Sequence, residues 1–147
     1  MRPKNTIEDD DLFSPFIFKK NHLIEPDVLS ALKQTLEPEG CTIIHCHYKA
    51  PDQFINGGWV NIARTTYLIN TEDNALLSMF QVHNIPISPE RHYFERIHQK
   101  KTFTLFFPAL PFFWHSFSII EMTEEPSPFI VHNLKRNASG VYHITMT

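Results

Sequence analysis

The sequence is poor in the residues that mark several common classes of protein. Its 147 residues include only two cysteines and four glycines. A disulfide-rich scaffold and a glycine-rich phosphate loop are therefore not expected. No more than two Lys or Arg residues stand together, and the formal net charge is -3. Because nucleic-acid-binding proteins usually carry a basic face, nucleic acid is not an expected partner.

Long uninterrupted apolar runs are also missing. The most apolar stretch, residues 103–114, contains six aromatic side chains, but Pro108 and Pro111 break it. A membrane-spanning helix needs about 20 consecutive apolar residues, so no membrane segment is expected. The N-terminus leads into the acidic run Glu8–Asp11 rather than into the apolar core of a secretory signal. These features favour a cytoplasmic protein with reduced thiols.

Short β-rich runs separated by turn residues make up most of the chain. Cys41–Lys49 alternates cleanly, so that Ile44, Cys46 and Tyr48 would share one face and the intervening residues the other. Further runs are expected at 59–62, 65–69, 75–82, 101–107, 117–121, 129–133 and 141–146. Seven to nine short strands with little helix predict an all-β fold, an antiparallel β-sandwich of immunoglobulin-like or jelly-roll-like topology.

The organisation expected from this pattern is a single domain. Residues 1–12 are polar and acidic and predict a disordered tail, and residues 13–147 form one β-sandwich domain. The segment Ile24–Leu36 leaves two alternatives open. Its apolar residues follow helical spacing, yet the turn-like residues 36–40 before the next strand favour a hairpin.

The aromatic stretch predicts a central strand followed by a corner. Phe103, Leu105 and Phe107 would share one face of a strand that ends at the Pro-x-x-Pro unit, because proline cannot donate to a sheet ladder. Beyond that corner, an aromatic cap over one end of the core is expected from Phe112, Phe113 and Trp114.

Two histidines provide the only pattern that suggests a metal. His45 and His47 would project from the same strand face, where both could ligate a metal ion as in a cupin, with Asp52 as a third ligand. His132 or His143 could instead complete the set. The sequence departs from the cupin pattern in three ways: Asp52 stands where Glu is usual, Gly40 precedes His45 by one residue too few, and the second motif with its later histidine is not found. A metal-dependent enzyme is therefore only the alternative prediction. No catalytic residue and no cofactor are assigned.

Two loops are the candidate contact regions. One is the turn Asn56–Trp59, and the other is the loop from Arg91 to His98. Loops on a rigid β-scaffold often carry binding residues, and arginine can bind carboxylate or phosphate with two hydrogen bonds. The binding residues predicted from these loops are Asn56, Trp59, Arg91, His92, Tyr93, Arg96 and His98.

Four segments together resemble an uncharacterised bacterial β-sandwich accessory domain, which occurs alone or appended to secreted or peptidase-type modules. They are Gly57–Ile62 with Thr66–Leu68, Asn84–Phe94, Phe103–Pro111 and Phe117–Glu121. The resemblance covers roughly residues 28–146. It implies a sandwich, favours strand over helix at 28–36, and brings no catalytic residues.

The function expected from the sequence is a non-enzymatic interaction module. It would bind a protein partner through a sheet face or through its end loops, and an open edge strand could also drive self-association. A pocket for a small apolar ligand inside the sandwich is a third possibility.

Overall fold

A computed structural model describes residues 40–146 of the chain. The expected acidic tail, residues 1–12, and the ambiguous segment Ile24–Leu36 lie outside the described residues. Ten strands and one 3-10 turn, but no α-helix, occur between residues 40 and 146. The all-β class is therefore confirmed, with more strands than the seven to nine expected.

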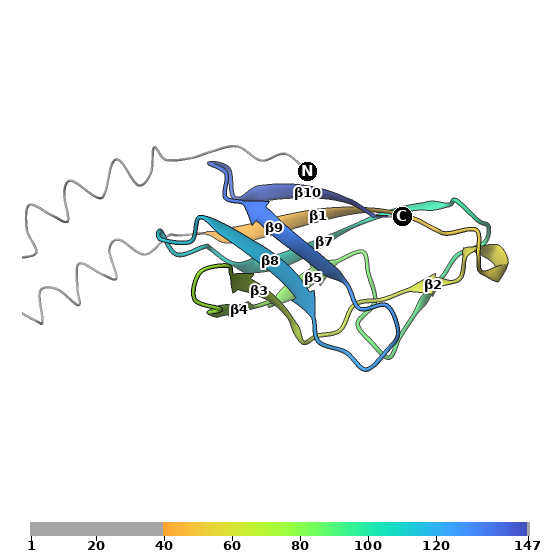
Figure 1. The fold of residues 1–147 in the computed structure, drawn as a ribbon. Helices are drawn as coiled ribbons and strands as arrows, with labels where there is room; N and C mark the ends of the chain where they lie inside the picture. The colour runs from red at the N-terminus through yellow and green to blue at the C-terminus, as the bar shows by residue number, and fades with distance from the viewer. Residues whose placement is uncertain (1–39, 147) are drawn as a thin grey trace, which may run out of the picture.

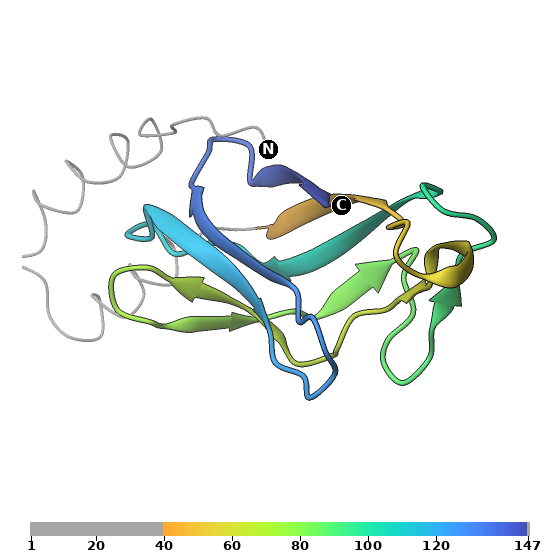
Figure 2. The same cartoon turned by 45° about the vertical axis from the view of Figure 1, so that its right-hand side comes forward.

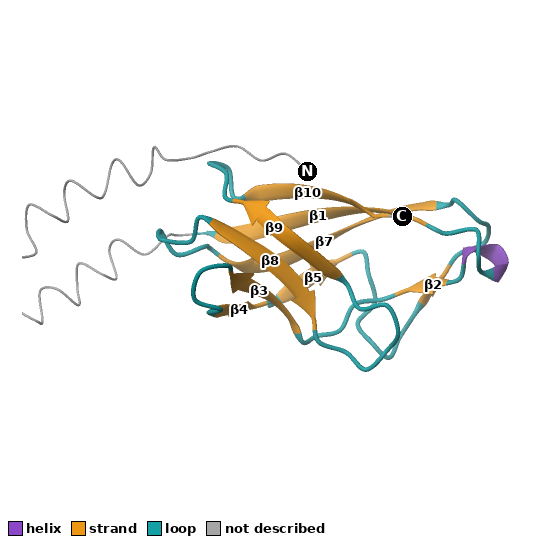
Figure 3. Ribbon diagram, in the orientation of Figure 1, coloured by secondary structure: helices purple, strands orange, loops and turns teal. Residues whose placement is uncertain are grey.

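Two four-stranded sheets face each other, as Figures 1 and 3 show. The first has the order β10-β1-β7-β5, formed by β10 (Val141–Met146), β1 (Cys41–Lys49), β7 (Lys100–Pro108) and β5 (Gln81–His83). The second has the order β4-β3-β8-β9, formed by β4 (Leu76–Ser78), β3 (Thr66–Asn70), β8 (Ser116–Glu121) and β9 (Ile130–Lys135).

Strands β1 and β7 form the centre of the first sheet and alternate as the sequence predicts. Ile44 and Cys46 of β1 are fully buried, and Leu105 of β7, which pairs with Ile44, is buried as well. The outward residues of both strands are mostly more polar, with Ile43 of β1 and Phe106 of β7 as apolar exceptions. The alternation works because successive side chains of a strand point to opposite faces.

One strand pair departs from the expected antiparallel arrangement. β10 runs parallel to β1, with Ile44 opposite Tyr142 and Cys46 opposite Ile144. The first sheet is therefore mixed, whereas every pair in the second sheet is antiparallel. Strand alternation alone predicts which face is buried but not the direction of the neighbour, which explains the error. The immunoglobulin-like or jelly-roll topology stays a prediction.

The expected strand at residues 75–82 is divided between the two sheets. β4 pairs with β3, and β5 pairs with β7. The change of sheet falls at two consecutive residues, where the Met79 amide donates to Thr66 of the second sheet and the Phe80 amide donates to Phe106 of the first. One extended segment thus provides an outer strand of each of the two sheets.

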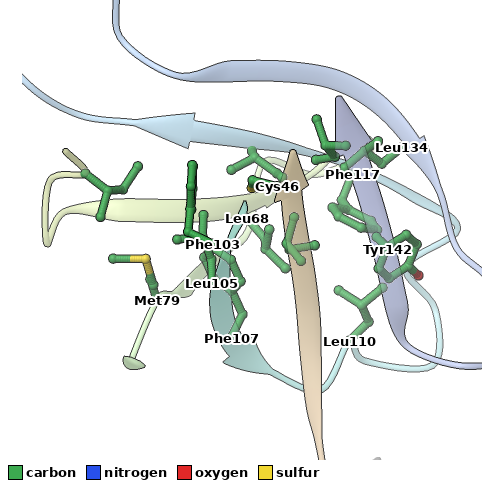
Figure 4. Close-up of a cluster of buried hydrophobic side chains, with 14 of the residues drawn as sticks. Cys46, Leu68, Met79, Phe103, Leu105, Phe107, Leu110, Phe117, Leu134 and Tyr142 are labelled. Carbon is green, nitrogen blue, oxygen red and sulfur yellow. The ribbon is translucent and has the colours of Figure 1, made fainter. Parts of the chain in front are cut away.

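The core lies between the two sheets and is rich in large side chains, as Figure 4 shows. Phe103, Leu105 and Phe107 all point into it, which confirms the expected inward face of the aromatic stretch. The rings of Phe117 from β8 and Tyr142 from β10 meet edge to face across the sheets, with centroids 5.1 Å apart. Such ring pairs add to the stability that burial alone provides.

The aromatic cap is only partly as expected. Trp114 is 1% exposed and belongs to the core, but Phe113 is 60% exposed. The backbone of Trp114 donates to Pro111, so the chain makes a tight turn after the Pro-x-x-Pro unit. Because neighbouring residues of such a turn face different directions, only part of the aromatic triplet can reach the core. The expectation for Phe113 is wrong.

Candidate binding surface

Two loops meet at the end of the molecule where β1 finishes and β7 begins. The first loop carries the 3-10 turn η2 (Ile55–Gly57) and leads into β2 (Trp59–Val60), and the second carries β6 (His92–Tyr93). Strands β2 and β6 pair as a short antiparallel ribbon. Figure 2 shows η2 and this ribbon together at one end. Residues 50–60 and 91–99 are called the end-loop surface below.

Backbone hydrogen bonds hold the two loops together. The Ala50 amide donates to Gln99 at 2.9 Å, the His98 amide donates to Ala50 at 2.8 Å, and the Phe94 amide donates to Gly58 at 2.9 Å. Phe94 is 5% exposed, and its ring stacks on Tyr48 with centroids 5.7 Å apart. These contacts anchor the end-loop surface to the end of β1.

Gly57 allows the loops to approach this closely. Its φ of +90° lies in the left-handed region, which residues with a Cβ rarely adopt. A Cβ at this position would lie 2.7 Å from the Arg96 carbonyl oxygen and 2.8 Å from the Cβ of Ala50. The turn predicted from Asn56, Gly57 and Gly58 is therefore present, and its glycine has a packing reason.

The structure brings most of the predicted binding residues into one place. Trp59 stands opposite Tyr93 in the β2–β6 ribbon. The guanidinium carbon of Arg91 lies 3.9 Å from the centre of the Trp59 ring, within range of a cation–π interaction. Asn56 lies in the turn with a positive φ of 56°, and Arg96 contributes the carbonyl beside Gly57.

The two predicted histidines of this surface have different surroundings. The ring of His92 meets Phe94 edge to face at 5.1 Å. Partial burial lowers the pKa of His92, the nearby charge of Lys101 lowers it further, and Glu95 acts in the opposite direction. The pKa of His92 therefore lies below the ordinary value of histidine. His98 lies 3.8 Å from a carboxylate oxygen of Asp52, and both side chains are more than half exposed.

Sequence reasoning missed the apolar part of this surface. Ile55 is 90% exposed, Tyr93 64%, Phe54 55% and Ile97 43%. Tyr93 was among the predicted residues, but Phe54, Ile55 and Ile97 were not. The sequence does carry a signal, because Phe54 and Ile55 directly precede the expected turn Asn56–Trp59, and such connecting segments run over the protein surface. The end-loop surface therefore carries four large exposed apolar side chains on two adjoining loops.

The histidine pair of β1 lies beside His143, one of the two histidines named from the sequence as able to complete the set, rather than beside Asp52. His47 Nε2 lies 3.1 Å from His143 Nδ1, and His45 Nδ1 lies 2.9 Å from the hydroxyl of Thr104. Asp52 instead faces His98. Within residues 40–146, no group of three or more His, Cys, Asp or Glu side chains has an arrangement that could hold a metal ion. No metal site is assigned to these histidines.

The Cys46 thiol and a small depression beside Arg136 provide little chemistry. Burial raises the pKa of the Cys46 thiol to about 12, so it stays protonated and unreactive at neutral pH. A depression of about 130 Å³ lies beside Arg136 and the turn 137–140, which is small for a ligand pocket. The Arg136 guanidinium is used by the fold, since it donates to the carbonyls of Pro111 and Trp114.

Comparison of the chain with protein-family models, with curated proteins and with solved structures found no match. The resemblance stated from the sequence therefore identifies no family, and what the findings support is a mostly-β domain of 107 described residues, numbers 40 to 146. No helix in this range is long and apolar enough to cross a membrane.

Proposed function

We propose that this chain is a non-enzymatic interaction module that binds a protein partner through the end-loop surface. The observation that carries the proposal is the exposure of Phe54, Ile55, Tyr93 and Ile97 on two loops that are tied to each other and to β1. Exposed apolar patches of this kind mark interaction sites in soluble proteins. A rigid scaffold with binding loops at one end is a common arrangement for recognition.

The chemistry around the patch suits a protein interface. Tyr, Trp and Arg are the residues that most often dominate binding energy at such interfaces, and the surface offers Tyr93, Trp59 and Arg91 together. The stacking of Arg91 on Trp59 fixes two long side chains before binding. Side chains that are already ordered lose less entropy when the partner binds.

The partner can be another protein or a second copy of the chain. Self-association through an edge strand remains the alternative, since sheets end in unpaired strands. The other alternative, a cupin-like metal-dependent enzyme, has less support because Asp52 faces His98 rather than His45 and His47. Metal analysis of the purified protein tests that alternative directly. We also propose, from the sequence, that the chain is related to a bacterial accessory domain and that its sandwich has an immunoglobulin-like or jelly-roll-like topology.

The experiment compares substitutions of two exposed isoleucines, one on the end-loop surface and one outside it. Ile55→Ser removes the most exposed apolar side chain of the end-loop surface, whereas Ile130→Ser removes a 45% exposed one from β9 in the other sheet. The immobilised protein captures partners from an extract of its source cells. Each captured protein is then purified and its Kd for the three chains is measured by calorimetry.

A direct partner should bind the wild type and Ile130→Ser alike, and bind Ile55→Ser at least about tenfold more weakly, as expected for a central interface residue. If the purified chain self-associates, the same comparison is made by sedimentation. Equal weakening by both substitutions, or none by Ile55→Ser, would contradict the proposal.

A further inference from the structure

A second candidate surface lies on the first sheet, on the face that points away from the core. One row of cross-strand neighbours on this face contains three histidines, because His83 pairs with Thr104, Thr104 with His45, and His45 with His143. His47 stands in the next row, opposite Thr102 and Thr145. Four histidines from three strands therefore share one sheet face, which is called the histidine face below.

Hydrogen bonds and ring contacts hold three of these histidines close together. The ring of His143 lies 5.0 Å from that of His45 and stacks on that of His47 at 5.4 Å. The Thr104 hydroxyl lies 2.9 Å from Nδ1 of His45, and the Thr102 hydroxyl lies 3.4 Å from Nδ1 of His47. The 3.1 Å contact between His47 and His143 needs one ring nitrogen to donate and the other to accept. If both rings carried a proton on each nitrogen, no acceptor would remain between them and two positive charges would lie side by side.

The charged groups that the described strands contribute to this face all have the same sign. Lys49 of β1 pairs with Lys100 of β7 on the same side as the histidines. The remaining outward residues of the four strands are neutral, namely Cys41, Ile43, Gln81, Thr102, Thr104, Phe106, Pro108, Val141 and Thr145. Asp52, the first carboxylate after β1, faces His98 beyond the strand end. No outward residue of these described strands is acidic, and none is an arginine.

We infer that the histidine face binds an acidic segment of a protein partner, and that binding strengthens as the pH falls below neutral. At neutral pH the fixed charges of the face are Lys49 and Lys100. Histidine is the side-chain type whose charge changes most readily between about pH 5 and pH 8, and this face carries four histidines. Without anions, positive charges on these rings repel one another, and a carboxylate placed between the rings relieves the repulsion.

The composition of the face favours carboxylates on a peptide over phosphates. Phosphate recognition generally relies on arginine forks and dense Lys clusters, and the face has neither. An apolar row lies directly beside the histidines, with Ile43 between Phe106 and Val141. An extended peptide can place acidic side chains on the histidines and an apolar side chain on this row. The inference does not depend on the end-loop surface, which lies beyond the end of β1.

The test uses octa-aspartate as the acidic probe and octa-asparagine as its uncharged match. Binding is measured by calorimetry at about pH 5.5 and about pH 7.5, in low salt because screening weakens exposed charges. The variant His47→Asn/His83→Asn removes two charges from the face. The matched control, His132→Asn, removes the exposed histidine of β9 on the other sheet. Lys49→Gln/Lys100→Gln lowers the charge without touching a histidine.

Octa-aspartate should bind the wild type at the lower pH and hardly at the higher one. Both double variants should bind it at least about tenfold more weakly, as expected for the loss of two charge-assisted contacts, while His132→Asn binds like the wild type. Amide chemical shifts should change along β1, β7 and β10. The inference would be overturned if His132→Asn weakened binding equally, if octa-asparagine bound equally well, or if binding did not depend on pH. It would also be overturned if anionic lipid vesicles bound more tightly than octa-aspartate, or if the shift changes were confined to the end-loop surface.

Discussion

At the scale of single residues, burial decides the chemistry of side chains that look reactive or charged in the sequence. Cys46 lies among core side chains and is fully buried. Glu121 is 9% exposed, yet its two oxygens accept hydrogen bonds from the Ala63 and Phe129 amides at 2.7 and 2.8 Å. It therefore fastens two loops to β8. Both residues have structural roles that the sequence alone does not indicate.

Leu105→Ala tests whether the centre of β7 carries the core. Leu105 is fully buried and lies between Ile44 and Val82 of the neighbouring strands. Its replacement should lower the free energy of unfolding by about 2–5 kcal/mol, the usual cost of truncating a buried leucine. Urea unfolding followed by circular dichroism measures the change. Phe113→Ala is the control, because the exposed Phe113 ring should contribute little; a near-neutral Leu105→Ala would show that the core is placed wrongly.

The buried Cys46 thiol should make the free energy of unfolding fall as the pH becomes alkaline. Burial raises the pKa of its thiol from 9.0 to about 12, so the unfolded chain loses the proton before the folded protein does. The contribution is fully present below pH 9.0 and is lost as the pH rises towards about 12. The free energy of unfolding should fall in this range by up to about 1.4 kcal/mol per pH unit from this group alone.

Urea unfolding of the wild type and Cys46→Ala at several pH values from about 8 to about 11 isolates this effect. Burial also raises the pKa of Tyr48 and of Tyr142, and both chains keep these tyrosines. Cys46→Ala should be less stable at about pH 8 because it leaves a small cavity, but its stability should decline less steeply. Parallel curves for the two chains would contradict the prediction.

At the scale of elements, the sequence predicts strands well where one face is apolar and the other is not. The bounds of β1 match the expected Cys41–Lys49, and the inward face of β7 is as expected. The change of sheet at Met79 and Phe80 could not be predicted, because both parts continue the same extended pattern. Only the partner strands distinguish them.

The candidate surfaces likewise contain contacts that the sequence predicts and contacts that it does not. The Trp59–Tyr93 ribbon and the nearby Arg91 were expected from loops that are rich in aromatic and charged residues. The pairing of His47 with His143 joins residues 96 positions apart and depends on the parallel placement of β10. No local pattern specifies such a contact, since a strand can pair on either side and in either direction.

Gly57→Ala tests how tightly the end loops are joined, with Gly40→Ala as its control. Both glycines have a positive φ, but a Cβ at Gly40 meets nothing within 4 Å. Gly40→Ala should therefore cost only the backbone strain, about 1–2 kcal/mol. Gly57→Ala should cost a further 1–3 kcal/mol, roughly the penalty of overpacking, because its Cβ meets the Arg96 carbonyl.

Thermal and urea unfolding give the two costs, and amide chemical shifts show where each change acts. Gly57→Ala should move the signals of residues 50–60 and 91–99, whereas Gly40→Ala should leave them in place. Equal costs for the two substitutions would mean that the loops yield easily, and the rigidity on which the end-loop surface relies would then be absent.

At the scale of the whole molecule, the last strand completes the core. β10 runs beside β1 and supplies Tyr142 and Ile144, which are 0% and 5% exposed. The Tyr142 hydroxyl also accepts a hydrogen bond from the Asn137 amide at 3.0 Å. Because β1 lies between β7 and β10, loss of β10 would expose one edge of β1 and part of the interior at the same time.

A chain that ends at Gly140 should therefore lose cooperative folding rather than become slightly less stable. Removing two large core side chains costs several kcal/mol, about 3–5 for the aromatic one alone, which is comparable with the whole stability of a small domain. Near-ultraviolet circular dichroism and the sharpness of urea unfolding measure the loss. The full chain with Thr145→Lys is the control, since Thr145 points outward from the same strand and should tolerate the change. A synthetic peptide of residues 139–147 added to the shortened chain should restore the signal of the folded protein, because β10 is a single continuous edge strand. If the shortened chain unfolds as cooperatively as the full one, β10 is an accessory to the fold and the core must close without it.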